Sequence, residues 1–136
     1  MQSPRILMAD DNPGFLSTVR GLLGNQFTIT ASLETGEAVL REVPLLNPDV
    51  ILLDISMGDL DGLEVARRLR DMGCRAKIIM LSIHEGLEFV RAALAAGASG
   101  YVSKSRVNSD LIPAIDASCM GKLFVSSQLL ETVDHY

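Results

Sequence analysis

The fold of this chain is constrained most by one short apolar run that ends in a carboxylate, Asp49-Val50-Ile51-Leu52-Leu53-Asp54. Four consecutive apolar residues are too few for a core helix. Two of them are β-branched, which is typical of a strand buried on both faces in the middle of a parallel sheet. The carboxyl ends of strands in open α/β sheets face the ligand crevice, so we expect Asp54 to lie there.

Four more strands are predicted around this run, and they alternate with helices. The expected strands are Arg5–Ala9, Phe27–Ala31, Ala76–Leu81 and Gly100–Ser103. Apolar residues recur at helical spacing from Pro13 (capped by Asn12) to Gly24, from Glu34 to a stop at Pro44, from Leu63 to Gly73, from Phe89 to Gly97 and from Leu111 to Gly121. Five alternations predict a single α/β domain with a doubly wound parallel sheet.

Composition and charge limit the classes of function. The chain has 136 residues, 48% of them hydrophobic and 21% charged, as in an ordinary soluble domain. A net charge of −5 argues against nucleic-acid binding by this chain alone, because a phosphate backbone requires a basic surface. No apolar run approaches the roughly 20 residues of a membrane span, and residues 1–4 begin no signal peptide. We therefore expect a cytoplasmic protein without membrane contact, with Cys74 and Cys119 as reduced thiols.

Polar side chains terminate four of the five predicted strands. The first strand ends at Asp10-Asp11, the third at Asp54, the fourth at Ser82 and the fifth at Lys104. These residues should meet at one edge of the sheet, where three carboxylates repel one another. A pair about 4 Å apart costs about 4 kcal/mol at an effective dielectric constant of about 20. A cation must offset that charge, or some of the carboxylates must stay protonated.

The residue types at this edge are suited to phosphoryl transfer. Hard oxygen ligands with room for water suit Mg²⁺. Lys104 adds a compact positive charge and Ser82 adds a hydroxyl donor, so the pocket is suited to holding a phosphoryl group beside a metal. Asp54 would then be the nucleophile that forms an aspartyl phosphate.

As a set, these residues resemble the receiver domain of two-component response regulators. The resemblance covers residues 5–120 and is carried by Asp10-Asp11, Asp54 with Met57 and Asp61-Gly62, Ser82, and Gly100-Tyr101-Val102-Ser103-Lys104. It implies a flavodoxin-like (βα)5 fold, a three-layer α/β sandwich with a central five-stranded parallel sheet. The receiver domain would occupy residues 4–121.

The same resemblance implies a role for each residue of the site. Asp54 would accept a phosphoryl group from a sensor histidine kinase, and Lys104 and Ser82 would contact that group. Mg²⁺ would be bound by Asp11, Asp54 and the backbone carbonyl of Ser56, with Asp10 behind them or acting through water. Ser82 and Tyr101 would form a switch that reshapes a face for partners or a homodimer. Such a domain is not an enzyme beyond its own phosphoryl transfer and dephosphorylation.

Residues 122–136 indicate a subfamily and are expected to begin a linker or tail. Gly121-Lys122-Leu123-Phe124-Val125-Ser126, with a short helical Gln128-Leu129-Leu130, resembles the linker of regulators that carry a LuxR-type or NarL-type helix-turn-helix. Transcription control, and any DNA contact, would then run through a C-terminal domain that is absent from this sequence. We favour a receiver separated from such a domain over a natural single-domain regulator.

Several residues have a second interpretation. Gly58 stands where the family usually places proline after Met57, and a more flexible loop would affect how long a phosphate lasts on Asp54. Asp10 could cap the first helix instead of serving the metal. Asp59 and Asp61 are predicted to be turn residues. His84 is expected to be an exposed loop histidine near the pocket rim, with an influence on the attacking water as the alternative.

Two other classes of function stay open. The first is a receiver-like interaction module that works without phosphorylation, which Gly58 keeps under consideration. The second is a Mg²⁺-dependent phosphatase of the haloacid-dehalogenase type, although those enzymes carry the pattern DxDx(T/V) after their first strand and Asp54 ends the third. Intact mass after incubation with a small phosphodonor and Mg²⁺ separates the three classes. An adduct indicates the receiver, no adduct the interaction module, and catalytic turnover the phosphatase.

Overall fold

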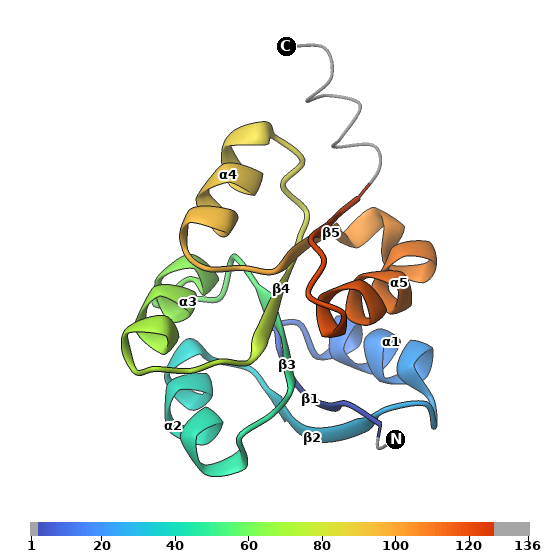
Figure 1. Cartoon of the computed structure of the whole chain (residues 1–136), viewed down its shortest axis with the longest axis horizontal. Coiled ribbons are helices and arrows are strands. Elements are labelled where there is room, and N and C mark those ends of the chain that lie inside the picture. Colours follow the sequence, from blue (N-terminus) through green and yellow to red (C-terminus); the bar gives the residue numbers. More distant parts are fainter. Residues whose placement is uncertain (1–2, 127–136) are drawn as a thin grey trace.

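The computed structural model describes residues 3–126, which form a parallel six-stranded sheet flanked by five α-helices (Figure 1). The strands are β1 (Arg5–Ala9), β2 (Thr28–Leu33), β3 (Val50–Asp54), β4 (Lys77–Ser82), β5 (Gly100–Ser103) and β6 (Phe124–Val125). The helices are α1 (Pro13–Leu23), α2 (Gly36–Leu46), α3 (Gly62–Asp71), α4 (Leu87–Ala95) and α5 (Val107–Cys119), with a 3-10 turn at Lys104–Arg106. The strand order β2-β1-β3-β4-β5-β6 confirms the doubly wound sheet.

The sheet lies between two layers of helices, with α1 and α5 on one face and α2, α3 and α4 on the other (Figure 1). Strand β3 is buried along its whole length. Its side chains alternate between the layers, because Ile51 and Leu53 belong to one apolar cluster and Val50 and Leu52 to the other. The apolar run is therefore the central strand that its composition predicted.

One helix boundary follows the predicted cap, and another departs from prediction. Asn12 caps α1 as expected, because its side chain accepts a hydrogen bond from the amide of Phe15 at 3.1 Å. Helix α2 does not stop at Pro44 but continues to Leu46, and Asn47 ends it in the left-handed conformation. Leu46 packs against the apolar core, so burial keeps this last turn helical although proline lacks an amide donor.

The sixth strand was not predicted. Phe124 and Val125 pair in parallel with Gly100 and Tyr101 of β5, within the segment that was expected to begin a linker. Two apolar residues are too few to show a strand period, so only the free edge of β5 reveals that they belong to the sheet.

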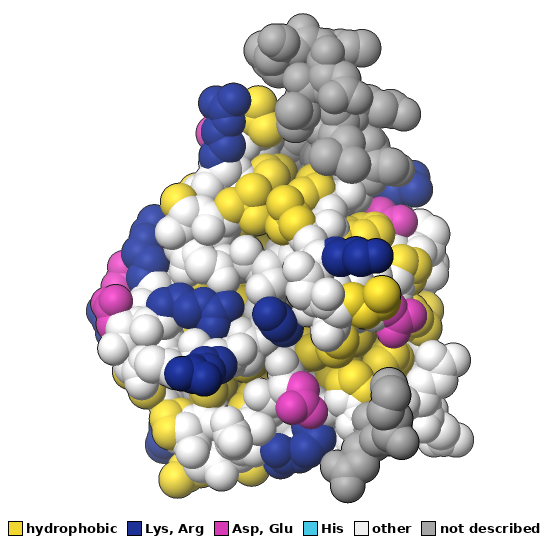
Figure 2. Space-filling model, in the orientation of Figure 1, with side chains coloured by type: hydrophobic (Ala, Val, Ile, Leu, Met, Phe, Trp, Pro, Cys, Tyr) yellow, Lys and Arg dark blue, Asp and Glu magenta, His cyan; other side chains and the backbone are white. Residues whose placement is uncertain are grey.

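A membrane span would be found among the helices, and a nucleic-acid interface would be a basic patch on the surface. Within residues 3–126, no helix has the length and apolar character that crossing a membrane requires. On the face drawn in Figure 2, the Lys and Arg side chains are separated by uncharged and acidic groups instead of forming one continuous basic patch among the described residues.

Candidate functional site at the carboxyl edge of the sheet

The polar residues at the strand ends lie at one edge of the sheet, as predicted. Asp10 directly follows β1, Asp54 ends β3, Ser82 ends β4 and Lys104 directly follows β5. Asp10 and Asp54 are buried, with 1% and 4% of their surface exposed, whereas Asp11 is exposed. One carboxylate oxygen from each of Asp10, Asp11 and Asp54 lies within 4.8 Å of the other two. Three oxygen ligands at this spacing could hold one metal ion.

Lys104 extends into this acidic cluster from the end of β5. Its ammonium nitrogen lies 2.6 Å from Oδ2 of Asp10 and 3.5 Å from Oδ1 of Asp54. The same nitrogen lies 4.4 Å from the centre of the Phe15 ring, which is cation–π geometry. Phe15 is one of the apolar residues that recur at helical spacing between Pro13 and Gly24, and that spacing did not predict its contact with the site.

The environment of Asp54 disfavours its charged form when no cation is bound. Burial raises its pKa from the ordinary 3.8 to about 6, and the negative charge of Asp10 adds to the rise. Lys104 and the Ser56 amide, which donates to Asp54 Oδ1 at 3.3 Å, act in the opposite direction. A cation beside Asp54 would therefore restore the ionised carboxylate that a nucleophile requires.

Two glycines shape the loop that follows Asp54. The Gly62 amide donates to the carbonyl of Ile55 at 2.6 Å, and a Cβ at Gly62 would lie 2.1 Å from the backbone oxygen of Asp54. Only glycine lets α3 begin this close to the strand end. Gly58 has a φ of +58°, a conformation that proline cannot adopt because its ring fixes φ near −65°. Glycine at position 58 therefore forms a left-handed turn that proline could not form, and its role is not only to make the loop more flexible.

The aspartates flanking this turn fill the turn roles predicted for them. Asp61 caps α3, because its side chain accepts a hydrogen bond from the Glu64 amide at 2.9 Å. Asp59 lies exposed in the loop. Asp10 does not cap α1, although its Oδ1 accepts a hydrogen bond from the amide of Asn12, the actual cap, at 2.9 Å. Its other oxygen contacts Lys104, so Asp10 belongs to the acidic cluster.

His84 connects the parts of the site that lie on different loops. Its amide donates to Ser82 Oγ at 2.9 Å, and its carbonyl accepts from the hydroxyl of Tyr101 at 2.7 Å. Its Nε2 lies 3.2 Å from Ser56 Oγ, and its ring stacks on Phe89 with centroids 4.2 Å apart. The residue is thus half-buried, and the expectation of an exposed loop histidine is wrong because Phe89 covers its ring.

Tyr101 of β5 is fully buried, and its hydroxyl contacts the β4–α4 loop. Burial raises the pKa of its phenol, and a hydrogen bond with Ser82 opposes that rise. The inward position that we expected after phosphorylation is therefore the position found in this structure. The switch role of Ser82 and Tyr101 stays a prediction.

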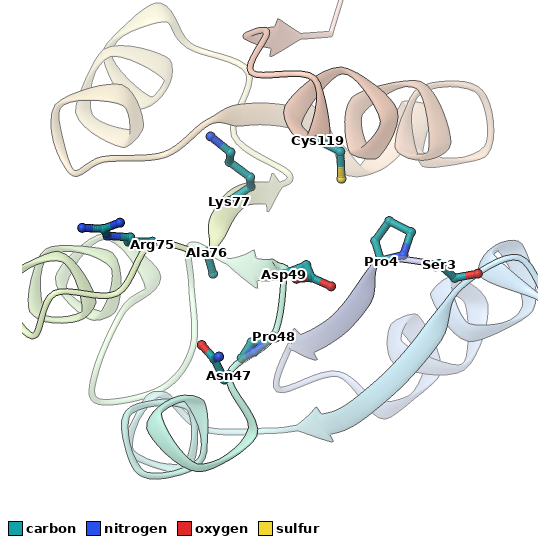
Figure 3. A pocket seen from close by; sticks show the side chains of 9 residues that line it. All are labelled: Ser3, Pro4, Asn47, Pro48, Asp49, Arg75, Ala76, Lys77 and Cys119. Carbon is teal, nitrogen blue, oxygen red and sulfur yellow. The ribbon is translucent and has the colours of Figure 1, made fainter. Parts of the chain in front are cut away.

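A cavity of about 630 Å³ lies at the opposite edge of the sheet, where the strands begin (Figure 3). Its lining includes Pro4, Asp49 and Lys77, which lie at or just before the first residues of β1, β3 and β4. Figure 3 shows the charged ends of Arg75 and Lys77 pointing away from Asp49 instead of converging on one point. The cavity therefore lacks the convergent polar groups of a ligand site, and it shares no residue with the acidic cluster.

A doubly wound sheet with an acidic cluster and a lysine at its carboxyl edge defines the receiver class. Residues 6–116 match the family model of the response regulator receiver domain, and the chain belongs to this family. The nitrate/nitrite response regulator protein NarL of Escherichia coli K12 is 32% identical over 126 residues, which are 91% of this chain and 58% of that protein. The transcriptional regulatory protein DegU of Brevibacillus brevis is 34% identical over 123 residues, 89% of this chain and 52% of that protein. The chain thus spans little more than half the length of these relatives.

Solved structures of receiver domains have the same fold. A LuxR-family two-component response regulator from Aurantimonas sp. SI85-9A1 superposes with a TM-score of 0.93 at 27% identity, covering 98% of this chain and 97% of that one. The isolated receiver domain of RcsB from Salmonella enterica serovar Typhimurium, solved with the phosphomimetic BeF3⁻, gives a TM-score of 0.84 at 26% identity over 94% of this chain and 99% of that one. The expected flavodoxin-like fold is confirmed, and the chain is a receiver domain of the NarL/LuxR type.

Proposed function

We propose that this domain accepts a phosphoryl group on Asp54 from a sensor histidine kinase, with Mg²⁺ as the required cation. One observation carries the proposal: the buried carboxylate of Asp54 shares its pocket with two further carboxylates and with the ammonium group of Lys104. This combination can hold a metal ion and a phosphoryl group side by side.

The donor set fits a hard, partly hydrated cation. Asp11 is exposed and can meet an ion that keeps several waters, whereas one oxygen of Asp10 is already bound to Lys104 at 2.6 Å. We therefore assign direct coordination to Asp11 and Asp54, with Asp10 acting through water. The backbone carbonyl of Ser56 is the further ligand that the family implies. When bound, the ion supplies positive charge that stabilises the transferring phosphoryl group.

In the chemical step, Asp54 reacts with a phosphohistidine of the kinase. An oxygen of Asp54 attacks the phosphorus of a phosphohistidine, the new P–O bond forms, and the P–N bond breaks. The leaving imidazole keeps the electron pair of that bond and takes up a proton. Lys104 Nζ, 3.5 Å from Asp54 Oδ1, is within reach of an oxygen of the attached group. Ser82 Oγ, which ends the neighbouring strand, donates a hydrogen bond to the same group.

Intact mass spectrometry after incubation with acetyl phosphate and Mg²⁺ tests the proposal. We expect one phosphoryl adduct on the parent protein and none on Asp54→Asn, which lacks the nucleophilic oxygen. Asp59→Asn is the matched control, because it makes the same chemical change in the exposed loop five residues away and should label like the parent. Full labelling of Asp54→Asn contradicts the assignment. A parent without adduct favours the interaction module, and continuous turnover favours the phosphatase.

The output of the domain is proposed to be control of transcription in the cytoplasm, with DNA contacts made by a further domain. The support is the names of the relatives NarL and DegU and a solved structure of two RcsB dimers bound to two parallel DNAs, which is 26% identical over 96% of this chain. A homodimer through the face of α4, β5 and α5 is the corresponding proposal for this chain. Light scattering with and without Mg²⁺ and beryllofluoride tests it, and an unchanged mass at high protein concentration contradicts it.

A further inference from the structure

The described chain ends in a strand that the proposed phosphoryl chemistry does not use. Strand β6 lies along the outer edge of β5 (Figure 1). Ser126 follows it and has no exposed surface. We propose that β6 and Ser126 position Tyr101 and Lys104 and thereby strengthen the binding of a phosphoryl group at Asp54. The inference rests on the proposed function and deepens it, because it assigns positioning residues to the same site.

Ser126 is held to β5 by two hydrogen bonds on either side of Val102. Its amide donates to the carbonyl of Tyr101 at 3.0 Å, and its hydroxyl oxygen accepts from the amide of Ser103 at 3.0 Å. The hydroxyl also makes a hydrogen bond with the carboxylate of Asp110 on α5. A serine hydroxyl that donates once and accepts once is well satisfied in a buried position.

Asp110 on α5 strengthens the binding of Ser126. Burial acts to raise its pKa, but hydrogen bonds from Ser126, Arg106 and Ser109 lower the pKa below the ordinary value. The Arg106 guanidinium donates at 3.1 Å and the Ser109 hydroxyl at 3.0 Å. The carboxylate is therefore an ionised acceptor fixed on α5, and a charged acceptor binds the Ser126 hydroxyl more strongly than a neutral one.

The first target of this attachment is Tyr101. Its hydroxyl is bound to the carbonyl of His84, and its own carbonyl is bound to Ser126, so both ends of the residue are held. Val125 lies opposite Tyr101 in the strand register and packs against the apolar cluster that contains the Tyr101 ring. A ring turned out of this cluster would lose that packing. A docked β6 therefore favours the buried ring, which is the position expected in the phosphorylated state.

The second target is Lys104, which follows Ser103 directly. The Ser103 backbone is fixed by Ser126, and the Ser103 hydroxyl donates to Glu85 Oε1 in the β4–α4 loop at 3.1 Å. This is the backbone from which Lys104 reaches Asp54. Misplacing it by a fraction of an ångström changes the contact of the ammonium group with a phosphoryl oxygen, so Ser126 acts on the site without touching it.

Substitution of Ser126 tests the inference, with beryllofluoride and Mg²⁺ as the phosphoryl probe. Ser126→Ala should weaken beryllofluoride binding by at least about 5-fold, the lower end of ordinary coupling between sites. Ser118→Ala is the matched control, because Ser118 is similarly buried but its hydroxyl donates to the Ile115 carbonyl within α5 and not to β5. Both variants lose a buried hydroxyl and some stability, but only Ser126→Ala should lower the affinity. An affinity within 2-fold of the Ser118→Ala protein overturns the proposal.

A measurement on the parent protein needs no variant. Because coupling is reciprocal, saturation with beryllofluoride should slow hydrogen exchange of the Ser126 amide by the same factor of about 5-fold or more. A parent that binds the analogue at Asp54 while its Ser126 amide exchanges at an unchanged rate overturns this inference alone. A parent whose resonances around Asp54 do not respond to the analogue overturns the proposed function and this inference together.

Discussion

The ammonium nitrogen of Lys104 lies 2.6 Å from Oδ2 of Asp10, a residue 94 positions earlier in the chain. Asp10 is buried and Lys104 is partly buried, with 2% of the aspartate side chain and 16% of the lysine side chain exposed. One lysine cannot balance the carboxylates of Asp10, Asp11 and Asp54, so the pocket retains negative charge that attracts a cation. A phosphoryl group on Asp54 would compete with Asp10 for the same ammonium group. The ion pair therefore gives Asp10 a role different from that of Asp11 and Asp54.

The first prediction concerns the metal. Asp11→Asn should weaken Mg²⁺ binding far more than Asp10→Asn, because Asp11 is free to coordinate directly and Asp10 is occupied by Lys104. Removal of a group that only supports the ligands typically costs about 10- to 100-fold in affinity, so the Asp11 variant should exceed that range. Calorimetric or NMR titration with Mg²⁺ measures the difference, and Asp59→Asn serves as the control. Equal affinities for the two variants and the parent would count against the assignment.

The second prediction concerns pH and stability without metal. The folded-state pKa of Asp54 is raised from 3.8 to about 6, so the folded protein holds this proton more tightly than the unfolded chain. The contribution of this proton to the free energy of unfolding is complete below about pH 4. It is lost as the pH rises through about 6, and the total loss is about 3 kcal/mol. Asp54→Asn does not ionise, so in EDTA it should gain stability relative to the parent between pH 4 and pH 7.5.

Urea unfolding of parent and Asp54→Asn at both pH values measures this change. Titrating groups that do not interact with Asp54 contribute equally to both proteins, so they cancel in the difference between them. Mg²⁺ at pH 7.5 should stabilise the parent and remove most of the advantage of the variant. A difference in stability between the two proteins that is the same at pH 4 and pH 7.5 would show that ionisation of Asp54 does not destabilise the folded protein.

The residues at the strand ends could be predicted because parallel strands all finish at one edge of the sheet. Once the strands were recognised, Asp10, Asp54, Ser82 and Lys104 had to meet there, whatever the loops did. The stacking of His84 on Phe89 could not be predicted in this way, because it depends on the path of the β4–α4 loop. Loop conformations follow from tertiary packing, which leaves no periodic signal in the sequence.

The cation–π contact and the sixth strand escaped prediction for two other reasons. Phe15 lies on the apolar stripe of α1, and its spacing does not reveal that it lies under an ammonium group. Phe124 and Val125 form a strand only because the edge of β5 is available to them. Both contacts join residues that are far apart in the chain, and a single sequence does not encode such pairs in any local pattern.

The third prediction concerns Gly58, whose φ is +58° with open space around the site of a Cβ. Gly58→Ala should lower the free energy of unfolding by about 1 kcal/mol, from backbone strain alone. Gly58→Asn should cost less, because asparagine tolerates this conformation. Gly58→Pro should cost more than alanine, since the ring forces the loop beside Asp54 to rearrange. Thermal or urea unfolding ranks the variants, and a proline variant as stable as the parent would show that the turn is not required.

The fourth prediction concerns the hydroxyl of Ser82, which accepts from the His84 amide at 2.9 Å and ends the strand beside Asp54. A phosphoryl group can shift the conformation of the domain only through contacts that differ between its two states. Ser82 is such a contact, because its hydroxyl oxygen is bound to the amide of His84. The carbonyl of the same His84 holds the Tyr101 hydroxyl, so a movement of Ser82 can reach Tyr101. Ser82→Ala should leave labelling by acetyl phosphate largely intact while reducing the NMR shift changes around Tyr101 on addition of beryllofluoride. Ser118→Ala should show the full response, whereas identical shift changes in the parent and Ser82→Ala would mean that the signal reaches Tyr101 by another route, such as the Lys104 backbone.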